Sequence, residues 1–206
     1  MNSTISFETS EFGLVPKKGN RRLCSVRNPI KEAKTWVGRQ VIHSDTKLIV
    51  VLGLAGGYHI DELCLRYPKT EIVVIEAEFQ IASKIKLKNK PIRVYTSIEN
   101  ILRSDLVERF YDLNNVQIIE HNISVSENSK FYNKAIASLT ARTPAAFKSL
   151  MKNRFNEDLS DVDLGSALMS VGANESYIVE RGLKNIAIKK NEKMKTIFHL
   201  ISEVVK

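Results

Sequence analysis

The sequence predicts a three-layer α/β fold on a mostly parallel sheet, followed by a helical C-terminal extension. Two short apolar runs, 47–52 and 71–75, are rich in β-branched residues and have the length of strands that are covered on both faces. Glycines follow the first run directly, and a helical pattern separates it from the second. This order of strand, glycine turn, helix and strand is the first unit of a doubly wound, Rossmann-like domain.

The N-terminal segment is expected to be less regular. Residues 1–27 are polar and carry turn signals, so we expect an irregular lead-in with a short hairpin around the turn at 17–20. A helix should begin at Asn28-Pro29, because Asn is a good N-cap and Pro suits the first helical position. Glu32 falls in its first turn, where a negative charge opposes the positive end of the helix dipole.

Alternation of helices and strands continues more weakly along the chain. We expect helices over 58–67, 79–87 and 98–111, and strands over 92–95 and 116–120. Short connections of this kind indicate a sheet covered by helices. Right-handed crossovers would place the carboxyl ends of all the strands, with their loops, along one edge.

After about residue 126 no further strand run of comparable quality appears. We therefore expect a Rossmann-like α/β domain over 1–126 and a helical extension over 127–206. Its expected helices are 131–140, 145–156, 163–170, 177–182 and 192–205, with 185–188 as a short edge strand. The last helix carries an apolar stripe that must be buried on the sheet or against another chain: Met194, Ile197, Phe198, Ile201, Val204 and Val205.

Composition restricts the class of protein. The 206 residues are 43% hydrophobic and 26% charged, which excludes wholesale disorder. Two cysteines exclude a disulfide scaffold and a multi-cysteine zinc fold. No apolar run approaches the roughly 18 residues that a membrane helix needs, and the N-terminus does not have the pattern of a secretory signal. We expect a cytoplasmic protein without a transmembrane segment.

The net charge of +8 is concentrated at the two ends of the chain. The basic clusters, 17–22 and 189–195, are short and have no interleaved aromatic residues, so a solvated basic face is favoured over a nucleic-acid site. Docking of these ends onto an acidic partner or an anionic membrane surface stays open. We expect a protein partner that binds through the basic termini or the C-terminal helix, with a homo-oligomer as a further expectation.

The glycine turn after the first strand is the expected ligand site. Glycines let the backbone approach a ligand closely, and the following helix offers free N–H groups and the positive end of its dipole. An acid at the end of the second strand can accept both hydroxyls of a ribose. The alternative is tight packing of strand on helix in an emptied domain, with the acid exposed at the strand end. The expected cofactor-binding residues are Gly53, Leu54, Ala55, Gly56, Gly57, Tyr58 and Glu76.

Two histidines flank this edge. His59 lies at a helix start and could titrate near neutral pH, and His121, after the strand over 116–120, could approach the same edge. A lone histidine at a helix end is more often a cap or a surface residue. No carboxylate or cysteine accompanies the pair at catalytic spacing, so the catalytic residues stay unassigned and no metal site is expected.

A glycine turn with a strand-end acid resembles the class I methyltransferases that use S-adenosylmethionine. Those enzymes carry an acid two positions before the first glycine, where this chain has Val51. The resemblance therefore implies a methyltransferase-like fold more than the activity.

A closer likeness is to the N-terminal region of bacterial motility accessory factors, the flagellin glycosyltransferase family related to MptE-like proteins. It covers roughly 10–160 and is carried by the segments 13–16, 28–33 with Trp36, 50–59, 74–76 and 143–156. In that family a following domain, marked by a Gly-Pro-Ser-Leu segment, carries the nucleotide-sugar chemistry, and this chain has no such segment.

The resemblance implies a standalone or truncated N-terminal module that binds a nucleotide or a protein partner and is not catalytic alone. The alternative is an S-adenosylmethionine-dependent methyltransferase. Whether the chain is an enzyme stays open; if it is one, it would be a methyltransferase or related to the glycosyltransferases. The ligand would accordingly be a nucleotide or S-adenosylmethionine.

Overall fold

A four-stranded parallel sheet organises residues 1–136, the first of two units into which the chain divides; the second is 137–206. The computed structural model describes residues 4–89, 92–112, 115–141, 143–155 and 158. The strands of the sheet are β4 (Leu48–Leu52), β5 (Glu71–Ile75), β6 (Arg93–Tyr95) and β7 (Val116–Glu120). These bounds confirm the four strands that the apolar runs predict.

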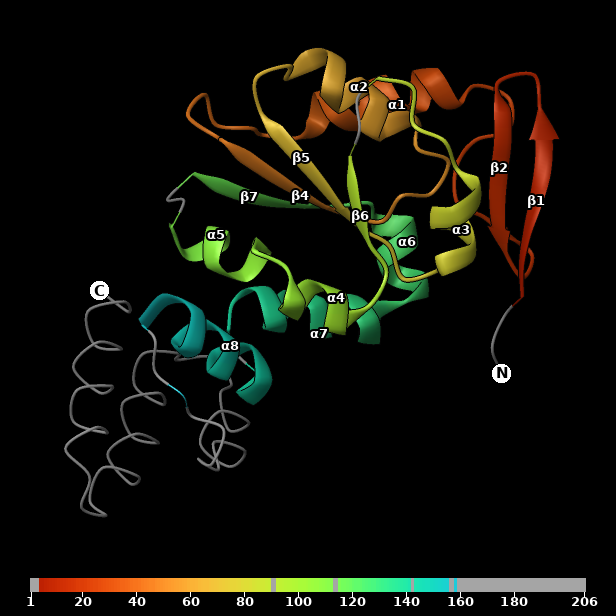
Figure 1. Ribbon diagram of the computed structural model, residues 1–206. Helices are drawn as coiled ribbons and strands as arrows, with labels where there is room; N and C mark the ends of the chain where they lie inside the picture. Colours follow the sequence, from red (N-terminus) through yellow and green to blue (C-terminus); the bar gives the residue numbers. More distant parts are fainter. Residues whose placement is uncertain (1–3, 90–91, 113–114, 142, 156–157, 159–206) are drawn as a thin grey trace. The chain divides into compact units, whose positions relative to one another are not determined.

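The strand order is β6-β5-β4-β7 (Figure 1). The first strand, β4, is therefore central, with β5 and β6 added on one side and β7 on the other. This order agrees with a Rossmann-like fold, and it reverses between β4 and β7, which makes the gap between their carboxyl ends the topological switch point. The strand register brings the last residues of three strands level with one another, because Leu52 lies beside both Ile75 and Glu120. The residues that follow these three strands therefore meet at one edge.

Burial explains why β4 is an unbroken apolar run. All five of its residues, 48–52, are fully buried, as a central strand covered by helices on both faces requires. Figure 1 shows α1 and α2 on one face of the sheet and α4 and α5 on the other. The helices of this unit are α1 (Pro29–Arg39), α2 (Tyr58–Arg66), α3 (Phe79–Lys84), α4 (Ile98–Arg103), α5 (Leu106–Asp112) and α6 (Asn122–Glu127).

Helix α1 begins where the sequence predicts. The Asn28 side chain accepts a hydrogen bond from the Lys31 backbone N–H at 3.1 Å, and Pro29 is the first helical residue. Glu32 lies in the first turn and accepts from the Ser25 backbone N–H at 2.6 Å. Trp36, on the same helix, is half-buried.

The expected irregular lead-in is instead a three-stranded antiparallel sheet. Its strands are β1 (Ile5–Ser10), β2 (Gly13–Lys18) and β3 (Arg21–Arg22). Only the second hairpin, with its turn at 19–20, matches the prediction. The first was missed because its alternation of apolar and polar residues is short, although Ile5 and Phe7 pack against the main core.

The solvated basic face expected for the N-terminal cluster is found in part: Arg21 and Arg22 are exposed, Lys17 and Lys18 are largely covered, and each of the four cations pairs with a carboxylate. The ion pairs are Lys17–Glu8, Lys18–Glu78, Arg21–Glu127 and Arg22–Glu8, at 2.6 to 3.2 Å. Lys18 also donates to the Glu127 carbonyl oxygen and to the Asn128 side-chain oxygen. The N-terminal sheet is thereby fastened to the segments that follow β5 and β7.

The helix expected over 98–111 is divided at Ser104 into α4 and α5. The Ser104 hydroxyl donates to the Ile101 carbonyl oxygen at 2.7 Å and accepts from the Leu106 backbone N–H at 3.2 Å, so one side chain caps both helix ends. The helix expected over 79–87 ends earlier, at Lys84, and α6 was not predicted.

Two further helices follow, α7 (Ser129–Leu139) and α8 (Pro144–Phe155), as expected over 131–140 and 145–156. The elements expected over 163–170, 177–182, 185–188 and 192–205 lie outside the described residues. The boundary expected at 126 stays a prediction. No helix in the described part of the chain is long and apolar enough to cross a membrane.

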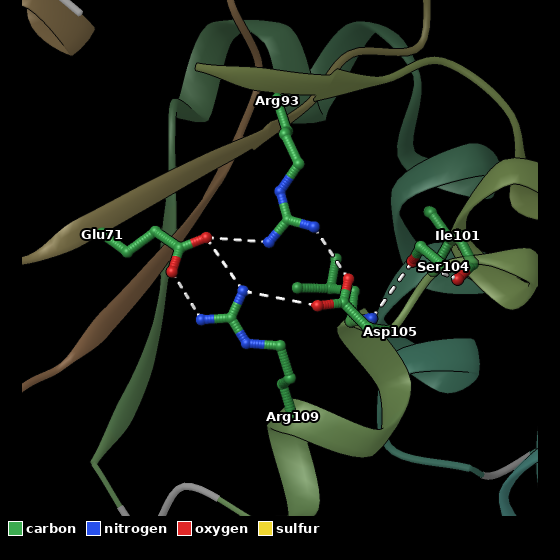
Figure 2. Close-up of polar contacts among 7 residues, drawn as sticks. Glu71, Arg93, Ile101, Ser104, Asp105 and Arg109 are labelled. Carbon is green, nitrogen blue, oxygen red and sulfur yellow. Dashed lines mark hydrogen bonds and ion pairs between the residues drawn. The ribbon is translucent and has the colours of Figure 1, made fainter. Parts of the chain in front are cut away.

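An ion-pair network lies at the amino edge of the sheet, where β5 and β6 begin. Figure 2 shows the side chains that form it. Glu71, at the start of β5, accepts from Arg93 of β6 at 2.8 Å and from Arg109 of α5 at 2.9 Å. Arg93 also donates to Asp105 at 2.7 Å. Hydrogen bonds from Arg109 and Arg93 lower the pKa of Glu71 to about 2, and the one from Arg109 has the larger effect. The network therefore ties two strands to the helix that covers them.

We expect Glu71→Gln to lower the free energy of unfolding at pH 7 by no more than about 1 kcal/mol, because the side chain is 41% exposed and solvent screens the pair. The folded carboxylate stays ionised down to about pH 2, whereas the unfolded one takes up a proton near 4.5. Its contribution is thus complete above pH 4.5 and is lost as the pH falls towards 2. Urea unfolding at pH 7 and pH 3 measures both effects, and Glu11→Gln, on an exposed turn, is the matched control. Equal pH dependence in the two variants would contradict the assignment.

Candidate functional site

The carboxyl edge of the sheet brings together the glycine turn and the strand-end acid. Gly53 directly follows β4, and Glu76 directly follows β5. Three turn residues have a positive φ: Gly53 (102°), Ala55 (43°) and Gly57 (79°). The turn then leads into α2 at Tyr58. All the residues expected to bind a cofactor therefore lie in one cluster.

Glu76 is buried inside this cluster rather than exposed at the strand end, with 1% of its surface accessible. One carboxyl oxygen accepts from the Leu54 backbone N–H at 2.7 Å, and the other accepts from the Glu78 backbone N–H at 2.9 Å. The Ala55 amide also interacts with this carboxylate. Burial raises the pKa of Glu76, and these backbone amides oppose that rise.

The remaining amides of the turn also have partners within the protein. Gly53 N–H donates to the Ile75 carbonyl oxygen and Gly57 N–H to that of Leu54, both at 2.8 Å. The Gly56 amide interacts with the sulfur of Cys24. A phosphate-binding loop needs N–H groups that are free to meet the anion. In this turn a carboxylate, a thiol and backbone carbonyls occupy them from within.

The glycines themselves permit close packing. A Cβ atom added to Gly53 would lie 2.5 Å from Ser124 Cβ, and one added to Gly56 would lie 2.6 Å from Cys24 Sγ. A Cβ on Gly57 would lie 2.9 Å from a methyl carbon of Ile85. The sequence allowed two interpretations of these glycines, ligand binding and close packing. The structure supports close packing.

A partly open cavity of about 100 Å³ lies beside the turn, between α1 and the residues that follow β4 and β7. Its lining includes Cys24, Glu32, Trp36, Tyr58, His59 and His121. The ends of β4 and β7 are the topological switch point of the sheet, where open α/β folds bind ligands. The cavity is therefore placed where a ligand is expected, although it does not lie over the glycines.

A wider groove of about 550 Å³ adjoins the cavity and shares Cys24, Glu32 and Ile123 with it. Arg22 and Arg27 line the groove. Arg22 pairs with Glu8, whereas Arg27 forms no ion pair with any residue that the structure describes. The groove thus carries charges of both signs, Arg27 and the Glu32 carboxylate, beside a cavity lined by aromatic rings.

The rings of His59 and His121 stack in the cavity wall, with centroids 4.6 Å apart and planes 19° apart. The indole of Trp36 meets His59 edge-on at 4.9 Å. His59 Nε2 lies 3.0 Å from the Gly53 carbonyl oxygen, and His121 Nδ1 lies 2.9 Å from the Ser124 hydroxyl. The structure therefore brings together two histidines that the sequence only suggested might share an edge.

Burial keeps these groups uncharged. It lowers the pKa of His121 to about 4, and it lowers that of His59 well below its usual value, with His121 as a second cause. Burial also raises the pKa of the Cys24 thiol to about 12, with the charge of Glu32 adding to the effect. A nucleophilic cysteine needs a lowered pKa, so Cys24 has the character of a structural thiol.

The cavity residues that the sequence analysis missed are Cys24, Glu32 and Trp36. They precede Gly53, the first residue of the glycine turn, by 17 to 29 residues, and only packing of α1 and the segment before it against the strand ends brings them there. Within the described ranges no group of three or more histidine, cysteine or acidic residues is arranged to hold a metal ion. Comparison of the chain with models of protein families, with curated proteins and with solved structures finds no match.

We expect protonation of the unfolded chain to weaken the protein as the pH falls from 6.5 to 4. An unfolded histidine takes up a proton near pH 6.5, whereas folded His121 does so near pH 4. Stability is therefore unaffected above this window and falls by at most about 3 kcal/mol across it for this one residue. Replacement by Asn keeps an acceptor for Ser124 and removes the titration.

The measurement is urea unfolding of wild type and His121→Asn at pH 7 and pH 5. The difference between the two pH values should be smaller in the variant. His43→Gln, which replaces an exposed histidine, serves as the control. A loss that is as steep in the variant as in wild type would show that His121 titrates normally.

Gly56→Ala should destabilise the protein by about 1–3 kcal/mol, because the new methyl group overlaps the Cys24 sulfur and the Tyr58 ring. A second change, Cys24→Ala, removes one of these obstacles, so the double variant should lose less than the sum of the two single losses. Thermal or urea unfolding of the four proteins completes the cycle. Gly38→Ala is the control: its Cβ would lie 3.6 Å from the nearest atom, and alanine should favour helix α1. Additive losses would refute close packing as the reason for glycine at position 56.

Proposed function

We propose that the chain is a nucleotide-binding module of the motility accessory type, without catalytic groups of its own. The ligand is proposed to bind in the groove and cavity between α1 and the ends of β4 and β7, beside the glycine turn. The sequence resemblance to the N-terminal region of that family supports the class of module. The placement of the cavity supports the site.

The single observation that carries the proposal is a cavity at the switch point that adjoins a groove lined by Arg27. The cavity is too small for a whole nucleotide, because pockets for such ligands have volumes of roughly 300–1,000 Å³. Together with the groove the space is of that size. The aromatic cavity suits a base, and Arg27 in the groove suits a phosphate.

Methyl transfer receives less support from the same geometry. A strand-end acid that holds a cofactor must present its carboxylate to that cofactor, and the carboxylate of Glu76 accepts backbone amides instead. The position of the missing acid, Val51, is fully buried within β4. The groove is also open to a peptide of a protein partner, and this reading gains weight if no nucleotide binds.

A thermal-shift panel tests the proposal on the full chain. The panel contains nucleoside mono- and diphosphates, nucleotide sugars, S-adenosylmethionine, S-adenosylhomocysteine and inorganic phosphate. A nucleotide at about one hundred times its Kd should stabilise the fold by roughly 2.7 kcal/mol, a shift of several degrees in Tm. Arg27→Gln should reduce the shift, because it removes a groove cation that forms no ion pair within the described part of the chain.

Lys34→Gln is the matched control, since Lys34 is an exposed cation on α1 that lines neither the groove nor the cavity. A shift with S-adenosylhomocysteine alone would make the methyltransferase alternative the leading one. The absence of a shift with every nucleotide would overturn the proposal.

A further inference from the structure

The two stacked histidines each leave one ring nitrogen without a hydrogen-bond partner among the residues that the structure describes. His59 is 5% exposed and His121 is 7% exposed. The hydrogen bonds of each ring within the described residues involve one nitrogen only: Nε2 of His59 and Nδ1 of His121. Buried polar atoms are rarely left without a partner, so water or a ligand in the cavity that both rings line would meet these nitrogens.

The existing hydrogen bonds determine which nitrogen carries the proton. A carbonyl oxygen only accepts, so His59 Nε2 must carry the hydrogen that it shares with Gly53, and Nδ1 is left as an acceptor. The Ser124 backbone N–H only donates and lies 3.4 Å from His121 Nδ1, which must therefore be an acceptor. His121 Nε2 then carries the hydrogen and is a donor. The two neutral rings that line the cavity thus carry one acceptor, His59 Nδ1, and one donor, His121 Nε2–H.

We infer that this pair recognises the hydrogen-bonding edge of a nucleobase. His121 Nε2–H donates to a carbonyl oxygen of the base, and His59 Nδ1 accepts from the neighbouring ring N–H. Such a lactam edge carries an acceptor beside a donor and has no net charge. The inference rests on the proposed function and adds the groups that would distinguish a base from the rest of a nucleotide.

The cavity has room for part of one ring. A cavity of roughly 150 Å³ in another protein is known to hold benzene, so about 100 Å³ with an opening onto the groove has room for the edge of one six-membered ring. Stacking of the two imidazoles and the edge-on indole of Trp36 make the wall rigid and aromatic. A phosphate or carboxylate is the poorer occupant, because neutral rings in a buried wall do not compensate a negative charge.

The ligand-side test compares uridine 5′-monophosphate with its 3-methyluridine analogue by isothermal titration calorimetry on the full chain. The methyl group replaces the hydrogen of the ring N–H from which His59 Nδ1 would accept a hydrogen bond. We expect it to weaken binding at least about tenfold, because one hydrogen bond is lost and a buried acceptor is left unpaired. Ribose 5-phosphate, which has no base, should bind at least as weakly as the methylated compound.

The protein-side test uses two amides that keep the structural hydrogen bonds. His59→Gln retains a donor for Gly53, and His121→Asn retains an acceptor for Ser124, while each removes the nitrogen that faces no protein partner. His59→Gln should bind uridine 5′-monophosphate and its methylated analogue with similar affinity. His121→Asn should bind both about tenfold more weakly than wild type does, and His43→Gln should behave as wild type.

The outcomes separate the inference from the proposed function. Equal binding of the methylated and unmethylated nucleotides by wild type would overturn the inference and leave nucleotide binding in place. A methyl effect of the same size in His59→Gln and wild type would also overturn it, because the base would then lie elsewhere. If neither nucleotide binds wild type, the proposed function fails, and the inference fails with it.

Discussion

The contact between the Glu76 carboxylate and the backbone amides of the glycine turn is the constraint on which the carboxyl edge depends. A turn that follows a parallel strand and opens a helix presents N–H groups that need an acceptor. Many α/β domains leave that role to a ligand. This chain supplies the acceptor itself, from the end of the adjacent strand, at 2.7 Å from Leu54. The turn is therefore held in its conformation by the protein, and the glycines can be packed as closely as the backbone allows.

As a result, the candidate site lies beside the glycine turn and not over it. With the turn filled by Glu76, Cys24 and Ser124, the space left at the switch point lies on the side of α1, against the rings of Trp36, His59 and His121. The same packing that excludes a ligand from the glycines buries the histidines and keeps them neutral. A site of this kind suits recognition of an uncharged edge better than acid–base chemistry. Burial lowers the pKa values of both histidines away from neutral pH, where a general acid or base exchanges protons most readily.

Much of the fold could be predicted from local patterns. The β-branched runs over 47–52 and 71–75 and the Asn28-Pro29 helix start are short-range signals, and the structure confirms them. The break at Ser104 depends on one side chain capping two helices, which no periodicity reveals. The cavity was beyond prediction for a different reason. Trp36 and His121 are far apart in the chain, and their rings lie 6.2 Å apart only because α1 packs beside the end of β7. The order of the glycines predicted a ligand site at the carboxyl edge of the sheet. Which ligand this edge can bind depends on residues that are distant in the sequence and close in space.

The fastening of the N-terminal sheet has a consequence for the order in which the chain acquires its structure. Lys18 binds Glu78, the Glu127 carbonyl oxygen and the Asn128 side chain, so its partners lie 60 to 110 residues further along the chain. Strand β4 likewise has β7 as one of its neighbours, and β7 begins only at Val116. Contacts over such separations form slowly, since the intervening chain must first be ordered. During synthesis the first strands therefore emerge long before the segments that bind them. The N-terminal sheet can form its contacts with the rest of the unit only after residues 78 and 127–128 have emerged.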